Sequence, residues 1–327
     1  MKGKHHIVIE SARLKYEFDI RRNITIIEGN SATGKTTLID LLRDHANSRS
    51  GQGIKLQSDV PCVVFSGDQN YWEPVIHSIQ NSIVFIDEDY TFIFSKDFAS
   101  AVRDSSCYFV LITRRSLPNL PYSISEIYGI RTSGRYHFPE KIYHEFYPIH
   151  EVFTPSGACS EPILITEDSM SGFQFFQKAG TSIRCESAEG NANIYNKLLS
   201  LQKHNQLIVI ADGAAFGAFI SVILSFAKAQ GKTMLFFPES FEWLILKSGV
   251  ISDPEIEGIL QHPEDYIEST AFFSWERFFT NLLESKTSGD PVKGYKKAKL
   301  SHFYLEGRNR DRILNELPVE IRNALLG

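Results

Sequence analysis

The stretch of sequence that decides the fold is Gly29-Asn30-Ser31-Ala32-Thr33-Gly34-Lys35-Thr36, followed by Thr37. It fits the pattern GxxxxGK[ST] without a gap. An Ile- and Thr-rich run, residues 23–28, precedes it as an expected strand, and an apolar-periodic segment, residues 35–45, follows it as an expected helix. The glycines would allow backbone N–H groups to turn inward around phosphate oxygens at a helix N-terminus, where partial positive charge collects. The stretch therefore predicts a phosphate-binding loop between a strand and a helix.

The polar residues of this loop have expected roles in nucleotide binding. Lys35 would reach the β- and γ-phosphates of ATP, and the Thr36 hydroxyl would ligate Mg²⁺. Residues 29–37 are therefore the expected nucleotide-binding residues, with ATP and Mg²⁺ as cofactors and Lys35 as a catalytic residue. The alternative is a chance glycine-rich turn, which the register of Lys35 and Thr36 and the flanking elements disfavour.

An acidic pair follows a compact apolar run farther along the chain. Residues 82–88 read Ser-Ile-Val-Phe-Ile-Asp-Glu, which is typical of a strand buried on both faces and ending in carboxylates. We expect this strand to neighbour the strand before the loop. Asp87 would then hold Mg²⁺ through water, and Glu88 would orient or deprotonate the attacking water. The alternative is a buried strand that ends in a solvated acidic turn.

The next apolar run, residues 107–113, ends in Thr113-Arg114-Arg115. Thr113 could sense the γ-phosphate and Arg114 could contact phosphate, although solvated arginines at a strand end are an equally good interpretation. Residues 5–115 resemble P-loop ATPases of the AAA or ABC type, in which an acidic strand end of this kind is called Walker B. No LSGGQ-like signature is present, and the short interval between Lys35 and Asp87 leaves little room for an ABC helical insertion. A small-molecule kinase is a weaker alternative, because the acidic pair suits hydrolysis better.

The second half of the chain carries its own acidic pattern. Expected strands at 163–166, 207–211 and 233–237 are followed by carboxylates, of which Glu167, Asp212 and Glu242 are the main candidates and Asp168 and Glu239 the reserves. The carboxyl ends of parallel strands meet at one edge of a sheet. Carboxylates that converge there repel one another unless a cation such as Mg²⁺ lies between them. The pattern predicts a metal site that could activate water against a phosphodiester.

The order of these carboxylates, over residues 162–247, resembles a TOPRIM domain. The whole layout is similar to prokaryotic mobile-element and phage-defence ATPases of the overcoming-lysogenization-defect or DUF4435 type. The resemblance implies that ATP gates a domain that cleaves or binds nucleic acid, with Glu167 catalytic. Ala214 departs from it, because a second Asp is expected there. The alternatives are a nucleotide-switched protein-interaction module with a degenerate TOPRIM-like domain, and an ordinary α/β domain with acidic loops.

Length and composition agree with an α/β protein of about two domains. The chain has 327 residues, of which 43% are hydrophobic and 22% charged, which excludes wholesale disorder. We expect a P-loop domain with a parallel sheet at 1–150, a linker at 154–162, a smaller TOPRIM-like α/β domain at 163–250 and a helical extension at 251–327. The strands at 181–185 and 233–237 and the helix at 216–230 belong to the TOPRIM-like domain.

Charge and targeting features bear on location and partners. The formal net charge is −5, so nucleic-acid binding would need a local basic patch. Lys293, Lys296, Lys297 and Lys299 form either such a patch or a solvated helical face. No CxxC pair, signal peptide or membrane span is apparent, which suits a cytoplasmic protein. The expected partners are ATP and a nucleic acid (DNA or RNA) or a protein, with a homo-oligomer left open.

Overall fold

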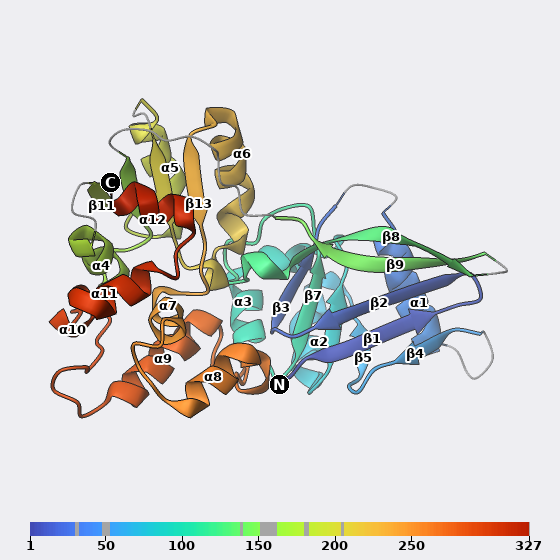
Figure 1. The fold of residues 1–327 in the computed structure, drawn as a ribbon. Helices are drawn as coiled ribbons and strands as arrows, with labels where there is room; N and C mark the ends of the chain where they lie inside the picture. Colours follow the sequence, from blue (N-terminus) through green and yellow to red (C-terminus); the bar gives the residue numbers. More distant parts are fainter. Residues whose placement is uncertain are drawn as a thin grey trace. The chain divides into compact units, whose positions relative to one another are not determined.

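The computed structural model describes residues 1–29, 33–47, 53–137, 140–150, 162–179, 183–203 and 206–326. The chain forms two compact units (Figure 1). The first comprises residues 1–150 and 262–273, and the second comprises residues 151–261 and 274–327. Each unit is mixed α/β, as the sequence predicts: one contains a large, parallel-rich sheet and the other a parallel sheet followed by helices. None of the helices in the described part of the chain has the length and apolar character that a membrane crossing requires.

The first unit is built on a nine-stranded sheet in the order β4-β1-β2-β9-β8-β3-β7-β6-β5. Its strands are β1 (His5–Glu10), β2 (Leu14–Ile20), β3 (Ile24–Ile27), β4 (Lys55–Gln57), β5 (Cys62–Val64), β6 (Ile83–Ile86), β7 (Tyr108–Ile112), β8 (Ile127–His137) and β9 (Lys141–Pro148). Its helices are α1 (Lys35–Asn47), α2 (Trp72–Ser78) and α3 (Lys96–Arg103). Strands β8, β3, β7, β6 and β5 run parallel, whereas β1 pairs antiparallel with β2 and β4, and β8 with β9.

The expected adjacency of the two motif-bearing strands is wrong. Strand β7 lies between β3, which precedes the glycine loop, and β6, which precedes the acidic pair. Strands β3, β6 and β7 are buried at every residue, so all three have the same apolar character. Apolar runs identify buried strands but not their neighbours, which depend on pairings between distant parts of the chain.

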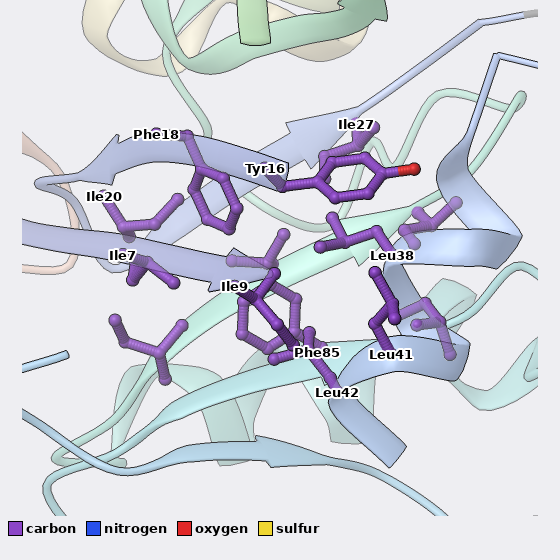
Figure 2. Packing of buried hydrophobic residues seen from close by; sticks show 14 of the residues in the cluster. Ile7, Ile9, Tyr16, Phe18, Ile20, Ile27, Leu38, Leu41, Leu42 and Phe85 are labelled. Carbon is purple, nitrogen blue, oxygen red and sulfur yellow. The ribbon is translucent and has the colours of Figure 1, made fainter. Parts of the chain in front are cut away.

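The core of the first unit holds α1 against the sheet. Leu38, Leu41 and Leu42 recur at helical spacing and are 8% exposed or less. Figure 2 shows them facing side chains from β1, β2 and β6, among which are Ile7, Ile9, Tyr16, Phe18 and Phe85. This packing fixes the start of α1, and with it the glycine loop, against the sheet.

The second unit contains a four-stranded parallel sheet in the order β11-β10-β12-β13. Its strands are β10 (Ile163–Thr166), β11 (Arg184–Ser187), β12 (Leu207–Ile210) and β13 (Thr233–Phe236). Its helices are α4 (Ser171–Ala179), α5 (Ile194–Leu201), α6 (Ile220–Gln230), α7 (Phe241–Lys247), α8 (Pro254–Gln261), α9 (Trp275–Thr287), α10 (His302–Leu305), α11 (Gly307–Leu314) and α12 (Val319–Leu326). Helix α4 packs against β11, α6 against β13, and α7 against α9 and α11.

The expected helical extension at 251–327 is not a separate body. Residues 262–273 join the first unit, where Gly3 N donates to Glu264 O at 2.7 Å and Asn23 Nδ2 to Phe273 O at 3.0 Å. The rest of the extension belongs to the second unit. Local periodicity predicts these helices but carries no information about which distant segment each one contacts.

Two further elements begin a few residues later than expected. The strand expected at 181–185 lies at Arg184–Ser187, and the helix expected from residue 216 begins at Ile220 after two short 3-10 turns, Gly213–Ala215 and Gly217–Phe219. Glycines at the first position of both turns break the helical pattern. The expected linker at 154–162 lies outside the described residues except for Pro162.

Candidate functional site

The glycine loop of the first unit has the backbone geometry that its sequence requires. Gly29 has a φ of +138° and Gly34 a φ of +95°, conformations that residues with a side chain rarely adopt. A Cβ at Gly34 would lie 2.8 Å from the Tyr16 hydroxyl oxygen, so a side chain has no room there. Asn30, Ser31 and Ala32 lie outside the described residues. Both glycines that frame the loop are therefore required by conformation, and Gly34 also by contact.

Lys35 turns back over this loop. It is the first residue of α1 and only 6% exposed, and its Nζ donates to Gly29 O at 2.5 Å and to Thr33 Oγ1 at 3.3 Å. Burial lowers the pKa of Lys35, while the charges of Glu88 and Asp87 act in the opposite direction. Thr36 is exposed at the start of the helix. The Lys35 ammonium is thus buried in the loop with carbonyl and hydroxyl partners that phosphate oxygens could replace.

Two acidic residues follow β6. Asp87 Oδ1 accepts a hydrogen bond from Glu88 N at 2.8 Å, and burial raises the pKa of Asp87. Glu88 makes a two-point ion pair with Arg114, because Arg114 Nε lies 3.1 Å from Oε2 and Nη2 lies 3.1 Å from Oε1. Arg114 follows β7, the strand between the two motif-bearing strands. The arrangement gathers Lys35, Asp87, Glu88 and Arg114 into one electrostatic group.

Thr113 does not offer its hydroxyl to this group. It is 2% exposed, and its Oγ1 donates to Arg115 O and accepts from Arg115 N, both at 3.0 Å. The expectation that Thr113 senses phosphate is therefore not supported, because its own turn uses both hydrogen-bonding functions of the hydroxyl. The guanidinium of Arg115 lies over the Phe94 ring, 4.2 Å from the centroid.

Two aromatic side chains that the sequence does not predict as site residues lie beside the loop. Tyr16 from β2 donates its hydroxyl to Gly34 O at 3.0 Å, and His144 from β9 stacks on Tyr16 with centroids 4.5 Å apart and planes at 10°. Burial raises the pKa of Tyr16 to about 12 and lowers that of His144. No local signal could have found this pair, because it depends on the parallel pairing of β2 with β9.

The second unit holds a small acidic cavity at the carboxyl ends of β10, β12 and β13. Its volume is about 30 Å³, which suits a small ion or one or two waters but not a nucleotide. The charged side chains that line it are Glu167, Asp168, Asp212, Glu242 and Lys297. The sheet therefore brings the three main candidate carboxylates to one place, as the strand order requires.

Each of these carboxylates already has a protein partner. Glu167 Oε2 accepts from Asp212 N at 3.2 Å, and Asp212 Oδ1 accepts from Phe241 N at 3.0 Å. Glu242 is fully buried, and its Oε1 accepts from the Tyr295 hydroxyl at 2.6 Å. Within the described part of the chain, Glu242 Oε2 has no hydrogen-bond partner.

Lys297 supplies positive charge to the cavity. Its Nζ lies 2.6 Å from Glu276 Oε1 and 3.8 Å from Glu242 Oε1. Burial opposes the charged form, but the carboxylates of Glu242, Glu276 and Asp212 together raise the pKa of Lys297. Neither expectation for the basic stretch, a phosphate-binding patch or a solvated helical face, describes Lys297, which lies in a non-helical segment and points into the unit.

Burial, together with neighbouring negative charge, raises the pKa values of two of the carboxyl groups. Burial, followed by the charges of Glu276 and Asp168, raises the pKa of Glu167 to about 7. Burial, followed by Glu276, Glu167 and Glu242, raises the pKa of Asp212 well above its ordinary value. A pKa of about 7 leaves Glu167 partly protonated at neutral pH.

The carboxylates do not converge as a ready metal cage. Over the described ranges, no group of three or more His, Cys, Asp or Glu side chains is arranged to hold a metal ion. Backbone N–H groups and the Tyr295 hydroxyl hold the oxygens of Glu167, Asp212 and Glu242 in separate hydrogen bonds. Ala214 is 2% exposed in the turn after Asp212 and adds no ligand.

The two reserve residues take part in further hydrogen bonds. Asp168 Oδ1 accepts from Met170 N at 3.0 Å within its own turn, and Glu239 O accepts from Ala214 N at 3.2 Å. The glycine-loop residues belong to the first unit and the residues of the acidic cavity to the second. A comparison of the chain with protein-family models, with curated proteins and with solved structures finds no match, so any assignment of function depends on these residues.

Proposed function

We propose that the first unit binds and hydrolyses ATP with Mg²⁺. The observation that carries the proposal is the buried Lys35 ammonium, which lies on the carbonyl of Gly29 inside a loop of two positive-φ glycines. The nearby charges of Asp87 and Glu88 act on the same ammonium. A glycine loop, a lysine and an acidic strand end are the parts that phosphoryl transfer from a nucleotide requires.

Each residue of the proposed site has a separate role in this reaction. Lys35 would neutralise charge on the β- and γ-phosphates, and Thr36 and Asp87 would hold Mg²⁺, which supplies electrostatic stabilisation of the phosphates when bound. Glu88 would orient the attacking water and accept its proton. Because Arg114 now holds both oxygens of Glu88, this role requires the guanidinium to exchange its carboxylate for another anion, such as a phosphate.

The proposal is tested with two variants of the loop and the acidic pair. Lys35→Ala should lose both ATP binding and hydrolysis, because the phosphates lose their main cation. Glu88→Gln should lower kcat at least about 100-fold while ATP binding persists, since it removes the proton acceptor and the charge that pairs with Arg114 but leaves Lys35 in place. Lys96→Ala, at an exposed site at the start of α3, is the matched control. Undiminished hydrolysis by Lys35→Ala would exclude the P-loop assignment.

For the second unit, two functions are proposed as alternatives. A TOPRIM-like, Mg²⁺-dependent action on nucleic acid, gated by ATP, is favoured by the three carboxylates that line one cavity and by the unpartnered Oε2 of Glu242. A nucleotide-switched docking module without chemistry is favoured by Ala214 and by the Lys297 charge among the carboxylates. Glu167 would be catalytic only in the first case.

Cleavage assays distinguish these alternatives. The first predicts nicking of DNA or RNA that requires Mg²⁺ or Mn²⁺ and is abolished in Glu167→Gln. The second predicts no nicking on plasmid, linear DNA or RNA, with or without ATP, and a protein partner whose affinity changes with the nucleotide. Glu320→Gln, at an exposed site of α12, is the control for loss of a carboxylate.

A further inference from the structure

The Tyr16–His144 stack lies directly against the glycine loop. The two residues are register partners on the parallel strands β2 and β9, so their side chains project from the same face of the sheet. A Cβ at Gly34 would lie 3.5 Å from both Cδ2 and Nε2 of His144. The edge of the imidazole thus borders the loop while its face lies on the Tyr16 ring.

Only one of the two rings is accessible. Tyr16 is 1% exposed and tied to Gly34 O, so it cannot receive a ligand. His144 is half-buried, and its Nδ1 has no hydrogen-bond partner among the residues that the structure describes. Tyr16 therefore acts as a fixed support, and His144 is the ring that a ligand could contact.

On the side of β9 away from Tyr16, the register partner of His144 has a short side chain. On the next strand, β8, the residue opposite His144 is Thr132, which is exposed and carries only a methyl and a hydroxyl. The register of the ladder shifts between Thr132 and Tyr136, so the regular pairing ends at this point. Neighbouring strands lie about 4.8 Å apart, and the observed ring spacing is similar. A planar group above Thr132 would extend the stack by one ring.

The Tyr16–His144 stack and the Lys35 ammonium lie at different ends of the glycine loop. The Lys35 ammonium contacts Gly29 and Thr33, and the charges of Asp87 and Glu88 act on it. The outer phosphates would therefore bind at this end of the loop. Tyr16 donates to Gly34 O and His144 lies beside Gly34, at the entry into α1. A nucleotide with its outer phosphates on Lys35 would direct its nucleoside away from that end.

We infer that His144 is the stacking surface for the base of a purine nucleoside triphosphate, held in place by Tyr16. The inference rests on the proposed nucleotide binding at the loop and adds to it the site of the base. An aromatic face attracts any base, and a purine offers the larger ring area. Purine nucleotides should therefore bind more tightly than pyrimidine nucleotides.

The test compares ATP with inorganic tripolyphosphate, which has no base. His144→Leu, of similar size but not aromatic, should weaken ATP binding about tenfold and leave tripolyphosphate binding unchanged. His144→Phe should retain the wild-type affinity for ATP. The wild type should bind ATP more tightly than CTP, and His144→Leu should reduce that difference.

The outcomes separate the inference from the function on which it rests. If Lys35→Ala abolishes ATP binding while both His144 variants bind ATP like the wild type, the stacking role is overturned and the nucleotide site stands. Equal weakening of ATP and tripolyphosphate by His144→Leu would show that His144 merely supports the loop, and would also overturn the inference. Unchanged binding of both ligands by Lys35→Ala would overturn the proposed function and the inference together.

Discussion

At the scale of single residues, the acidic cavity shows how position changes the chemistry of a side chain. Glu242 is fully buried and accepts a hydrogen bond from Tyr295, and the Lys297 ammonium lies nearby. A buried carboxylate is costly unless it is hydrogen-bonded and its charge is compensated. Removing either partner would therefore disturb the whole group and not a single contact.

Glu167 makes the stability of the second unit depend on pH. Its folded-state pKa of about 7 lies above the ordinary value, so its contribution is complete in acid and is lost as the pH rises through 7. Glu167→Gln keeps the side-chain oxygen that accepts from Asp212 N and mimics the protonated form. We expect this variant to gain about 1–3 kcal/mol over the wild type between pH 5 and pH 8.

Urea unfolding at the two pH values measures this gain. Glu320→Gln, at an exposed site, reports the general effect of removing one negative charge. A stability difference between Glu167→Gln and the wild type that does not change with pH would contradict the prediction.

At the scale of elements, α1 holds the glycine loop through its buried face. Leu38 is 0% exposed and lies one turn from Lys35, within the core that joins α1 to the sheet. Leu38→Ala should lower the free energy of unfolding by about 2–4 kcal/mol, because it leaves a cavity that packed neighbours cannot fill. In urea unfolding, Leu38→Ala should lower the midpoint concentration and leave the m-value unchanged.

The control for this substitution lies two residues farther along the same helix. Asp40 is exposed and forms a surface ion pair with Arg43 at 3.3 Å, so Asp40→Ala should change the free energy of unfolding by less than about 1 kcal/mol. Similar losses in both variants would contradict the prediction, because they would show that the effect of Leu38→Ala does not come from lost packing.

The elements also show what the sequence could predict. Strands β6, β7 and β10 were located to within about two residues, because complete burial produces an uninterrupted apolar run bounded by polar residues. The conformations of Gly29 and Gly34 follow from the motif alone. Three features could not be predicted: the position of β7, the pairing of β2 with β9, and the inward direction of Lys297. Each depends on which distant segments pair, and local periodicity does not encode that choice.

At the scale of the whole molecule, the C-terminal residues are structural parts of both units. Residues 262–273 belong to the first unit, and Trp275, Phe279 and Leu283 of α9 are buried in the second. A chain that ends at Gln261 should therefore be insoluble or lack a cooperative thermal transition, since both units lose packing and Glu242 loses Lys297 and Tyr295.

A shorter truncation is the control for this prediction. Removing residues 319–327 deletes only α12, whose Ile321 and Leu325 are buried, and should lower the Tm while a cooperative transition persists. A soluble, cooperatively folding chain that ends at Gln261 would contradict the assignment of the C-terminal residues to the two units.

The interleaving of the two units has a consequence for synthesis on the ribosome. Because residues 262–273 complete the first unit, that unit cannot finish folding when its first 150 residues emerge, and must wait until most of the second unit has been translated. Contacts between residues so far apart in sequence also slow folding. For the same reason, a gene fusion that exchanges everything after residue 150 would move the second unit whole but would leave the first unit without residues 262–273.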